Sequence, residues 1–393
     1  MPFDLASRTI VFVHGIFGWG PGELPVSYWG HALGQFDPKF AVHEVKCGPV
    51  GSFHDRACEL FAQLYGGDFI YDPTRVGADA DKGPKRARVP RGERPEAQDR
   101  LVPNWSAQNP IVLVGHSAGA HTCLELQQLL AQNFWGVGST ADWIEAIVCI
   151  SGVLNGSTLT YHYGCDPVSG LLIGNPQRLI GATVEVTSAL APFTPAHLTI
   201  HPWLQQWTDL NAFVNGRDNL AYDLTLVGCR GANANFTTHA NTYYLSLVTG
   251  MPNDGPRVPI LGIPIPWPLG DVMNPLLRDA ADFQTNVQFA PDKPPLPDWG
   301  ENAALSIDAW RPNDGAVSSI SQRHPFTAKA EPVGGSILKD GPVKKGKWYF
   351  EPVENIVGRR FDHLDPAFGF LLKPDVRQAH ELLHQKLNAL LLG

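Results

Sequence analysis

The sequence predicts an α/β fold in which helices flank a mostly parallel central sheet. Two short runs, residues 8–15 (RTIVFVHG) and 110–117 (PIVLVGHS), are continuously apolar, which is typical of strands covered on both faces. Helical spacing of apolar residues follows these runs, over 55–66 and 120–134. Strands and helices therefore alternate along the chain, and this alternation favours a parallel sheet.

Later segments extend the same pattern. Residues 144–152, 223–228 and 241–250 predict further strands. A closing helix that packs on the sheet is predicted near the carboxyl end, where one stripe carries Leu383, Leu387, Leu390 and Leu391. Because the chain has neither an internal repeat nor a low-complexity tract, we expect one domain over residues 1–393.

Two stretches interrupt this alternation. Residues 72–108 are polar, rich in Pro and Gly, and mixed in charge, which predicts a solvated insertion. Residues 165–210 instead hold apolar or amphipathic pieces separated by Pro and Gly. They predict either an extra helical layer of the core or a mobile lid over a hydrophobic cleft.

Composition excludes several classes of protein. The net charge is −8, so the chain as a whole favours neither nucleic acid nor an anionic membrane. No run approaches the ~18 apolar residues of a transmembrane helix. Residues 1–15 lack a basic segment followed by a long apolar one, so no signal peptide is expected. Two locations stay open: the cytoplasm, or secretion in a form that has lost its leader.

Six cysteines are too few for a disulfide framework, and they include no C-x-x-C pair that would predict a zinc or redox site. Cys123 and Cys149 lie in apolar runs and are expected to be buried thiols. A single bridge between Cys165 and Cys229 is the alternative.

A tight turn between a predicted strand and a predicted helix is the clearest indication of chemistry. Residues 115–119 read Gly-His-Ser-Ala-Gly, and the two glycines relieve crowding where the backbone reverses. Ser117 is thereby held in an exposed, strained position at a helix N-terminus, as a nucleophile requires. The alternative is a glycine-rich turn that contains a serine by chance.

A serine hydroxyl needs a base to accept its proton and an acid to orient that base. In hydrolases with such a turn the chain order is Ser, acid, His, so the late loop histidine His363 is the candidate base. Asp314 in the turn Asn-Asp-Gly, after an apparent strand, is the candidate acid, with Asp308 as its rival.

Other histidines are assigned ordinary roles. His121, His380 and His384 occupy helix positions, and His116 lies inside the turn and faces the wrong way.

Acyl transfer also needs donors for a developing oxyanion. The amide of Ala118, directly after the serine, is one candidate. The amide of Ile16, in the glycine-rich loop after the first strand, is the other. The Ile16 side chain would then face the acyl group, which favours an apolar acyl chain.

Ten segments in order, among them VHGIFGWGPGEL, GHSAG, WLQQWTDL, NTYYLSL, NDGAVSSIS and FDHLD, resemble the Geobacillus–Staphylococcus lipase family over nearly the whole chain. The resemblance implies an α/β-hydrolase fold with a helical lid near 165–210 that opens at lipid interfaces. It also implies a triad of Ser117, Asp314 and His363. The oxyanion positions would be Ile16 and Ala118, where the family usually carries Phe and Gln.

The family also holds a structural zinc ion between two Asp and two His. The resemblance places the aspartates at Asp55 and Asp223, but no histidine occurs between His54 and His116, where the family has its own. Two carboxylates alone bind zinc poorly, so we expect no zinc of this type and a pairing of the aspartates with Arg56 or another cation.

The family's calcium site uses an acid two residues after the histidine and a later Asp-Pro. This sequence merges both into Asp365-Pro366, which argues against calcium.

The sequence thus predicts a serine ester hydrolase, a lipase or carboxylesterase, which needs no cofactor for its chemistry. Expected substrates are small-molecule or lipid esters with apolar acyl groups. A lipid–water interface is a further expected partner. A polyester hydrolase, an amidase or an acyltransferase would use the same triad, and a non-catalytic binding protein would keep only the fold.

Overall fold

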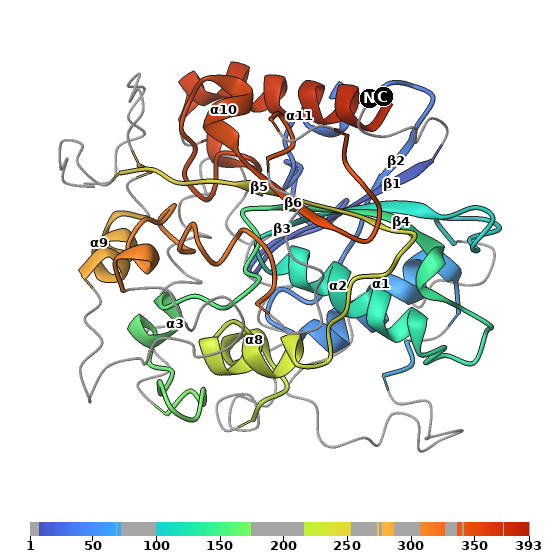
Figure 1. Ribbon diagram of the computed structural model, residues 1–393, viewed down its shortest axis with the longest axis horizontal. Coiled ribbons are helices and arrows are strands. Elements are labelled where there is room, and N and C mark those ends of the chain that lie inside the picture. The colour runs from blue at the N-terminus through green and yellow to red at the C-terminus, as the bar shows by residue number, and fades with distance from the viewer. Residues whose placement is uncertain are drawn as a thin grey trace.

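The computed structural model describes residues 8–67, 69–71, 100–173, 216–252, 273–274, 277–286, 307–326, 336–339, 342–371 and 373–392. Within them one parallel sheet has the strand order β2-β1-β3-β4-β5-β6 (Figure 1). The strands are β1 (Thr9–Val13), β2 (Ala41–Glu44), β3 (Ile111–His116), β4 (Ile144–Ile150), β5 (Tyr243–Val248) and β6 (Trp348–Pro352). The predicted parallel α/β sheet is therefore confirmed.

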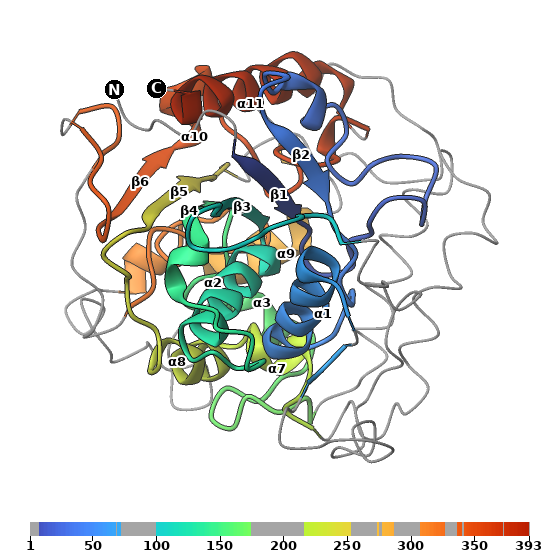
Figure 2. The same cartoon turned by 90° about the vertical axis from the view of Figure 1, so that its right-hand side faces the viewer.

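The helices form two layers around this sheet. They are α1 (Phe53–Tyr65), α2 (Ala118–Ala131), α3 (Leu159–His162), α7 (Leu220–Asp223), α8 (Leu226–Asn233), α9 (Arg278–Asn286), α10 (Val353–Val357) and α11 (Arg377–Leu392). Figures 1 and 2 show α10 and α11 on one face of the sheet and α1, α2 and α8 on the other. The long helices α1, α2 and α11 bury their apolar residues against the sheet, which explains the layering.

Alternate residues of the strands supply the two halves of the core. On β1, Ile10 and Phe12 pack toward the face with α11, whereas Val11 and Val13 pack toward the face with α1 and α2. All four side chains are fully buried. A strand buried on both faces has no polar position, and this is why β1 and β3 appear in the sequence as unbroken apolar runs.

The predicted closing helix is α11. Leu383, Leu387 and Leu391 are buried in the core, and Leu390 is partly buried against it. This stripe attaches the carboxyl end of the described chain to the sheet, and it also supports the loop that precedes α11.

One predicted strand is wrong. Residues 223–228 span the end of α7 and the start of α8 rather than a strand. Two side-chain caps decide the outcome: Asn219 accepts a hydrogen bond from the Tyr222 amide, and Thr225 accepts one from the Gly228 amide. The short apolar run Leu-Thr-Leu-Val fits a helix or a strand equally well by periodicity, and the caps favour helices.

The predicted insertions are described only in part. Of residues 72–108 the structure describes 100–108, and of residues 165–210 it describes 165–173, so both predictions lie largely outside the described residues. All six cysteines are described, and all are buried free thiols, so the alternative bridge between Cys165 and Cys229 is not formed. Within the described chain, no helix combines the length and apolar character needed to span a membrane.

Candidate active site

The turn between β3 and α2 holds Ser117 at the carboxyl edge of the sheet. Its backbone has φ 56° and ψ −125°, a strained conformation for a residue with a side chain. A Cβ at Gly115 would lie 2.5 Å from the Ala120 nitrogen, and one at Gly119 would lie 2.1 Å from the Val13 oxygen. Only glycine fits at either position, and this crowding explains the Gly-x-Ser-x-Gly pattern.

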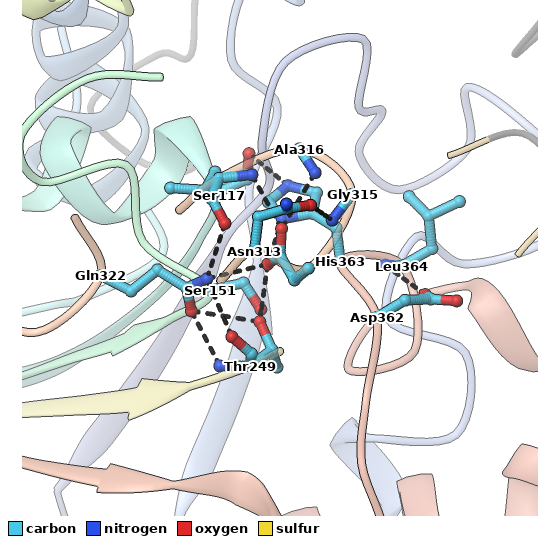
Figure 3. A network of polar contacts seen from close by, with 12 residues as sticks. Ser117, Ser151, Thr249, Asn313, Gly315, Ala316, Gln322, Asp362, His363 and Leu364 are labelled. Carbon is cyan, nitrogen blue, oxygen red and sulfur yellow. Dashed lines mark hydrogen bonds and ion pairs between the residues drawn. The ribbon is translucent and has the colours of Figure 1, made fainter. Parts of the chain in front are cut away.

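His363 reaches Ser117 from a loop near the carboxyl end, 246 residues away in sequence. Its Nε2 lies 2.9 Å from the Ser117 Oγ, and its Nδ1 lies 2.9 Å from the Asp314 Oδ2 (Figure 3). All three residues are at most 6% exposed. The structure thus brings together the serine, histidine and aspartate that the sequence selected, in the hydrogen-bond order that proton transfer requires.

The Asp314 carboxylate receives hydrogen bonds on both oxygens. The amides of Ala316 and Val317 donate to Oδ1 at 3.0 and 2.8 Å. Burial alone would raise the pKa of Asp314, but the charge of His363 and the hydrogen bonds from His363, Thr249 and the Ala316 amide outweigh it and lower the pKa. The rival Asp308 instead pairs with Arg311 at 3.4 Å, and its side chain is 74% exposed.

Three polar residues behind Asp314 have no precedent in the sequence reasoning. Thr249 Oγ1 and Gln322 Nε2 donate to the Asp314 Oδ2 at 2.7 and 3.0 Å. Thr249 Oγ1 also lies 2.8 Å from Ser151 Oγ, as the network in Figure 3 shows. Thr249 directly follows the end of β5, and Ser151 directly follows the end of β4, so a polar residue at a strand end was the only available signal.

His116 does not bond the Ser117 hydroxyl, as the sequence predicted, and its ring instead connects Tyr28 to the His363 loop. Its Nε2–H donates to the His363 carbonyl at 2.8 Å, and its Nδ1 accepts from the Tyr28 hydroxyl at 2.6 Å. The Tyr28 oxygen in turn accepts the Gly15 amide at 3.2 Å. Burial, followed by the charge of His363, lowers the pKa of His116 to about 3, so the ring is neutral.

The two proposed oxyanion donors flank the serine. Within the described part of the chain, neither the Ile16 amide nor the Ala118 amide has an acceptor. The Ile16 loop is held in place because the Phe17 amide donates to the Pro49 carbonyl at 2.9 Å. The Ala118 amide is the first of α2, where helix amides lack intrahelical partners and the helix dipole is positive.

A pocket that is partly open to solvent lies at this edge of the sheet and is lined by Ser117 and His363. Parallel α/β sheets commonly bind ligands at this edge. Most of the other lining side chains are apolar, and they include Ile16, Val153, Leu172, Leu224, Val317 and Phe368. The pocket can therefore accept an apolar group next to the serine hydroxyl.

One of the two aspartates that the resemblance places at a zinc site already has a backbone partner. Asp223 Oδ2 accepts the Phe53 amide at 2.6 Å. Arg56, the expected partner of the aspartates, donates to the carbonyl of Gly48 and to Thr122 Oγ1. The described residues contain no group of three or more His, Cys, Asp or Glu side chains able to hold a metal ion.

Calcium does not fit the described residues near His363 either. The Asp365 Oδ2 lies 2.7 Å from the Lys373 ammonium, which already provides that carboxylate with a positive partner.

The parallel sheet, the strained serine turn and the late histidine define the α/β-hydrolase fold. No protein-family model matches the chain. Its sequence is similar to those of staphylococcal lipases: Lipase 2 of Staphylococcus aureus is 23% identical over 389 residues, which cover 92% of this chain and 50% of that protein. The chain thus spans about half the length of this curated relative.

Solved structures support the same fold. EstA from Clostridium botulinum superposes with a TM-score of 0.67 at 22% identity, covering 100% of this chain and 88% of its own. Staphylococcus hyicus lipase superposes with a TM-score of 0.63 at 19% identity, covering 99% and 96%.

Proposed function

We propose that the protein hydrolyses carboxylic esters with apolar acyl groups, as a lipase or carboxylesterase that forms an acyl-enzyme on Ser117. The observation that carries this proposal is the hydrogen-bonded line of Ser117, His363 and Asp314 beside an apolar pocket. The homology to lipases supports the same reaction class. Either support alone would leave the reaction class open, because one fold hosts many functions.

In the first step, the Ser117 oxygen attacks the ester carbonyl carbon while His363 Nε2 accepts the hydroxyl proton. Asp314 stabilises the resulting imidazolium through Nδ1. The carbonyl oxygen becomes an oxyanion, and the Ile16 and Ala118 amides donate to it. When the tetrahedral intermediate collapses, the carbon–oxygen bond to the alcohol breaks and His363 returns its proton to the leaving alcohol.

In the second step, water repeats this sequence on the acyl-enzyme. His363 takes a proton from water, the hydroxide oxygen bonds to the acyl carbon, and the bond to Ser117 breaks. The carboxylic acid leaves and the proton returns to Ser117. Side chains and amides of this chain perform every proton transfer and charge stabilisation, so we propose that the chemistry needs no cofactor.

The lining of the pocket favours medium or long acyl chains over short ones. Leu172, in the described part of the predicted lid segment, lines the pocket. In the same segment, Val168 and Ile173 are 80% and 69% exposed, and exposed apolar side chains suit contact with a lipid–water interface. We propose that this segment contacts the lipid surface when an ester enters.

A panel of p-nitrophenyl esters tests chain length. We expect palmitate to be hydrolysed with a kcat/KM at least equal to that of butyrate, and a steep loss with chain length contradicts the proposed acyl preference.

The catalytic role of the serine is tested by Ser117→Ala, with Ser139→Ala as control. Ser139 is also buried and donates one hydrogen bond, to the Leu130 carbonyl, but it lies outside the pocket. We expect Ser117→Ala to reduce kcat by about 10³–10⁶-fold and Ser139→Ala to leave it unchanged. A fluorophosphonate should add one phosphonyl group to wild type but not to Ser117→Ala. Labelling without ester turnover would instead indicate another acyl transfer.

The acyltransferase alternative differs only in the acceptor. Product analysis with water and a primary alcohol both present separates free acid from transferred ester. A polyester film as substrate tests the polyester-hydrolase alternative in the same assay.

A further inference from the structure

A buried lysine closes the loop that carries His363. We propose that Lys373 is a positioning residue for His363, and that its ammonium supplies the positive charge that this loop needs, in place of a bound metal ion. The proposal rests on the proposed function for its kinetic readout, but its structural readout is independent of any activity.

The contacts of Lys373 are short and shielded from solvent. Its Nζ lies 2.6 Å from the Asp362 Oδ2 and 2.7 Å from the Asp365 Oδ2. All three side chains are 0% exposed. Two carboxylates this deep in a protein repel each other and lose their hydration, so a cation between them stabilises this form of the loop.

The same two carboxylates also hold the loop backbone. Asp362 Oδ1 accepts the Leu364 amide at 3.0 Å, and its Oδ2 accepts the Asn274 amide at 2.7 Å. Asp365 Oδ2 accepts the Asp362 amide at 2.9 Å. Lys373 therefore joins the two ends of a four-residue turn, residues 362–365, that contains His363 as its second member.

His363 is held on the other side by the rest of the site. Its amide donates to the Asp314 carbonyl at 2.9 Å, and its carbonyl accepts from His116 at 2.8 Å. Asp314 and His116 precede His363 in the sequence, whereas Lys373 follows it, so separate segments of the chain fix its backbone. The imidazole can reach both Ser117 and Asp314 only if its backbone stays where they hold it.

Lys373 also links this turn to the sheet. Its amide donates to the Gly369 carbonyl at 2.8 Å, and it precedes a 3-10 helix, Pro374–Val376, that leads into α11. From α11, His380 and His384 donate to the carbonyls of Asp365 and Pro366, each at 3.1 Å. Both histidines lie in a helix, as the sequence predicted, and both are fully buried. Through these bonds, α11 fixes the position of the turn that carries His363.

The test replaces Lys373 by methionine, which keeps the length of the side chain and removes its charge. We expect kcat to fall by about 10–100-fold with KM changed by less than about 3-fold, because a displacement of about 1 Å in a reacting group has an effect of this size. The far-downfield proton resonance of the His363 Nδ1–H, which is bonded to Asp314, should broaden or disappear.

Two control variants separate positioning from general loss of stability. Arg8→Met breaks an ion pair of 2.6 Å with Glu145, away from the pocket. Leu64→Ala opens a cavity in the core beside α1, on the opposite face of the sheet from α11, and should destabilise the protein by a comparable amount. Both should retain the wild-type kcat and the downfield resonance while folded.

Because an unpaired buried carboxylate can prevent folding, a second variant combines Asp362→Asn, Asp365→Asn and Lys373→Met. It carries no buried charge in the turn, and neutral groups in place of a buried ion pair are usually tolerated. We expect the same loss of kcat and of the downfield resonance. Wild-type values of both in either folded Lys373 variant overturn the positioning role.

Metal dependence tests the second half of the proposal. Wild-type kcat should not change after chelation and dialysis, nor after Ca²⁺ is added back. Activity that falls on chelation and returns with Ca²⁺ shows that a metal ion, and not Lys373, supplies the charge. If wild type hydrolyses no ester while the downfield resonance responds as expected, the proposed function fails and the positioning role stands.

Discussion

Replacing Tyr28 by phenylalanine removes one oxygen atom from the hydrogen-bond chain that joins the oxyanion loop to the histidine loop. The Tyr28 oxygen accepts the Gly15 amide at 3.2 Å and donates to His116 Nδ1 at 2.6 Å. Gly15 precedes Ile16, a proposed oxyanion donor, and His116 holds the carbonyl of His363. The ring of phenylalanine fills the same space, so the substitution affects hydrogen bonding alone.

The loss of stability can be calculated from the two groups left without partners. Each buried donor or acceptor without a partner costs about 1–3 kcal/mol, so Tyr28→Phe should lower the free energy of unfolding by about 2–6 kcal/mol. The effect on kcat should be about tenfold, which is smaller than the about 10²–10³-fold effect of removing an oxyanion donor outright. Both donors remain in this variant, and only their position relaxes.

Tyr244→Phe is the matched control. The Tyr244 hydroxyl also accepts a backbone amide, that of His239 at 2.9 Å, and also donates once, to Gln127 Oε1 at 2.7 Å. It is equally buried but does not line the pocket. Urea unfolding and p-nitrophenyl butyrate hydrolysis measure the two effects separately. Equal stability losses with equal, unchanged kcat values in both variants would refute the reasoning.

Three further changes follow from the same contacts. Burial lowers the pKa of His116 to about 3, so between about pH 6.5 and 3 this histidine binds a proton in the unfolded chain but not in the folded one. The free energy of unfolding therefore decreases as the pH is lowered through this range, by up to about 1.4 kcal/mol per pH unit. His116→Gln should make the urea-unfolding free energy less steep there, and an unchanged slope contradicts this. Asp314→Asn should reduce kcat by about 10⁴-fold while KM changes little; a loss below tenfold argues against its orienting role. Gly119→Ala should lower unfolding free energy by about 1–3 kcal/mol or more, because its Cβ would lie 2.1 Å from the Val13 oxygen; Gly34→Ala, which meets nothing within 4 Å, should not.

The sheet was predictable where strands are buried on both faces. β1, β3, β4 and β5 were predicted because each is a compact run of apolar residues. β2 and β6 were not predicted. All four residues of β2 are exposed or only partly buried, and β6 ends on Pro352, so neither gives a continuous apolar run. Whether such a segment forms an edge strand depends on its contacts with the neighbouring strand and helices, and these contacts exist only after the sheet has assembled.

The sequence by itself determined the local features of the site. The crowding that selects glycine at 115, against Gly119 and Ala120, and the helix that starts at Ala118 involve segments close in the chain, so the pattern of residues carries the information. Glycine at 119 belongs to the same pattern, although its crowding comes from Val13 on the neighbouring strand. The order of Ser117, Asp314 and His363 came from the same kind of local pattern, read through a resemblance to lipases.

Only the tertiary structure decided which distant groups surround those residues. Lys373, Tyr28, Thr249 and Gln322 lie in unremarkable sequence contexts, and each reaches the site through contacts between separate segments. The physical reason is the sequence separation of the interacting residues. Periodicity and turn chemistry depend on interactions between residues that are close in the sequence. A hydrogen bond such as the one between Tyr28 and His116, which are 88 residues apart, depends on how the strands and helices finally pack.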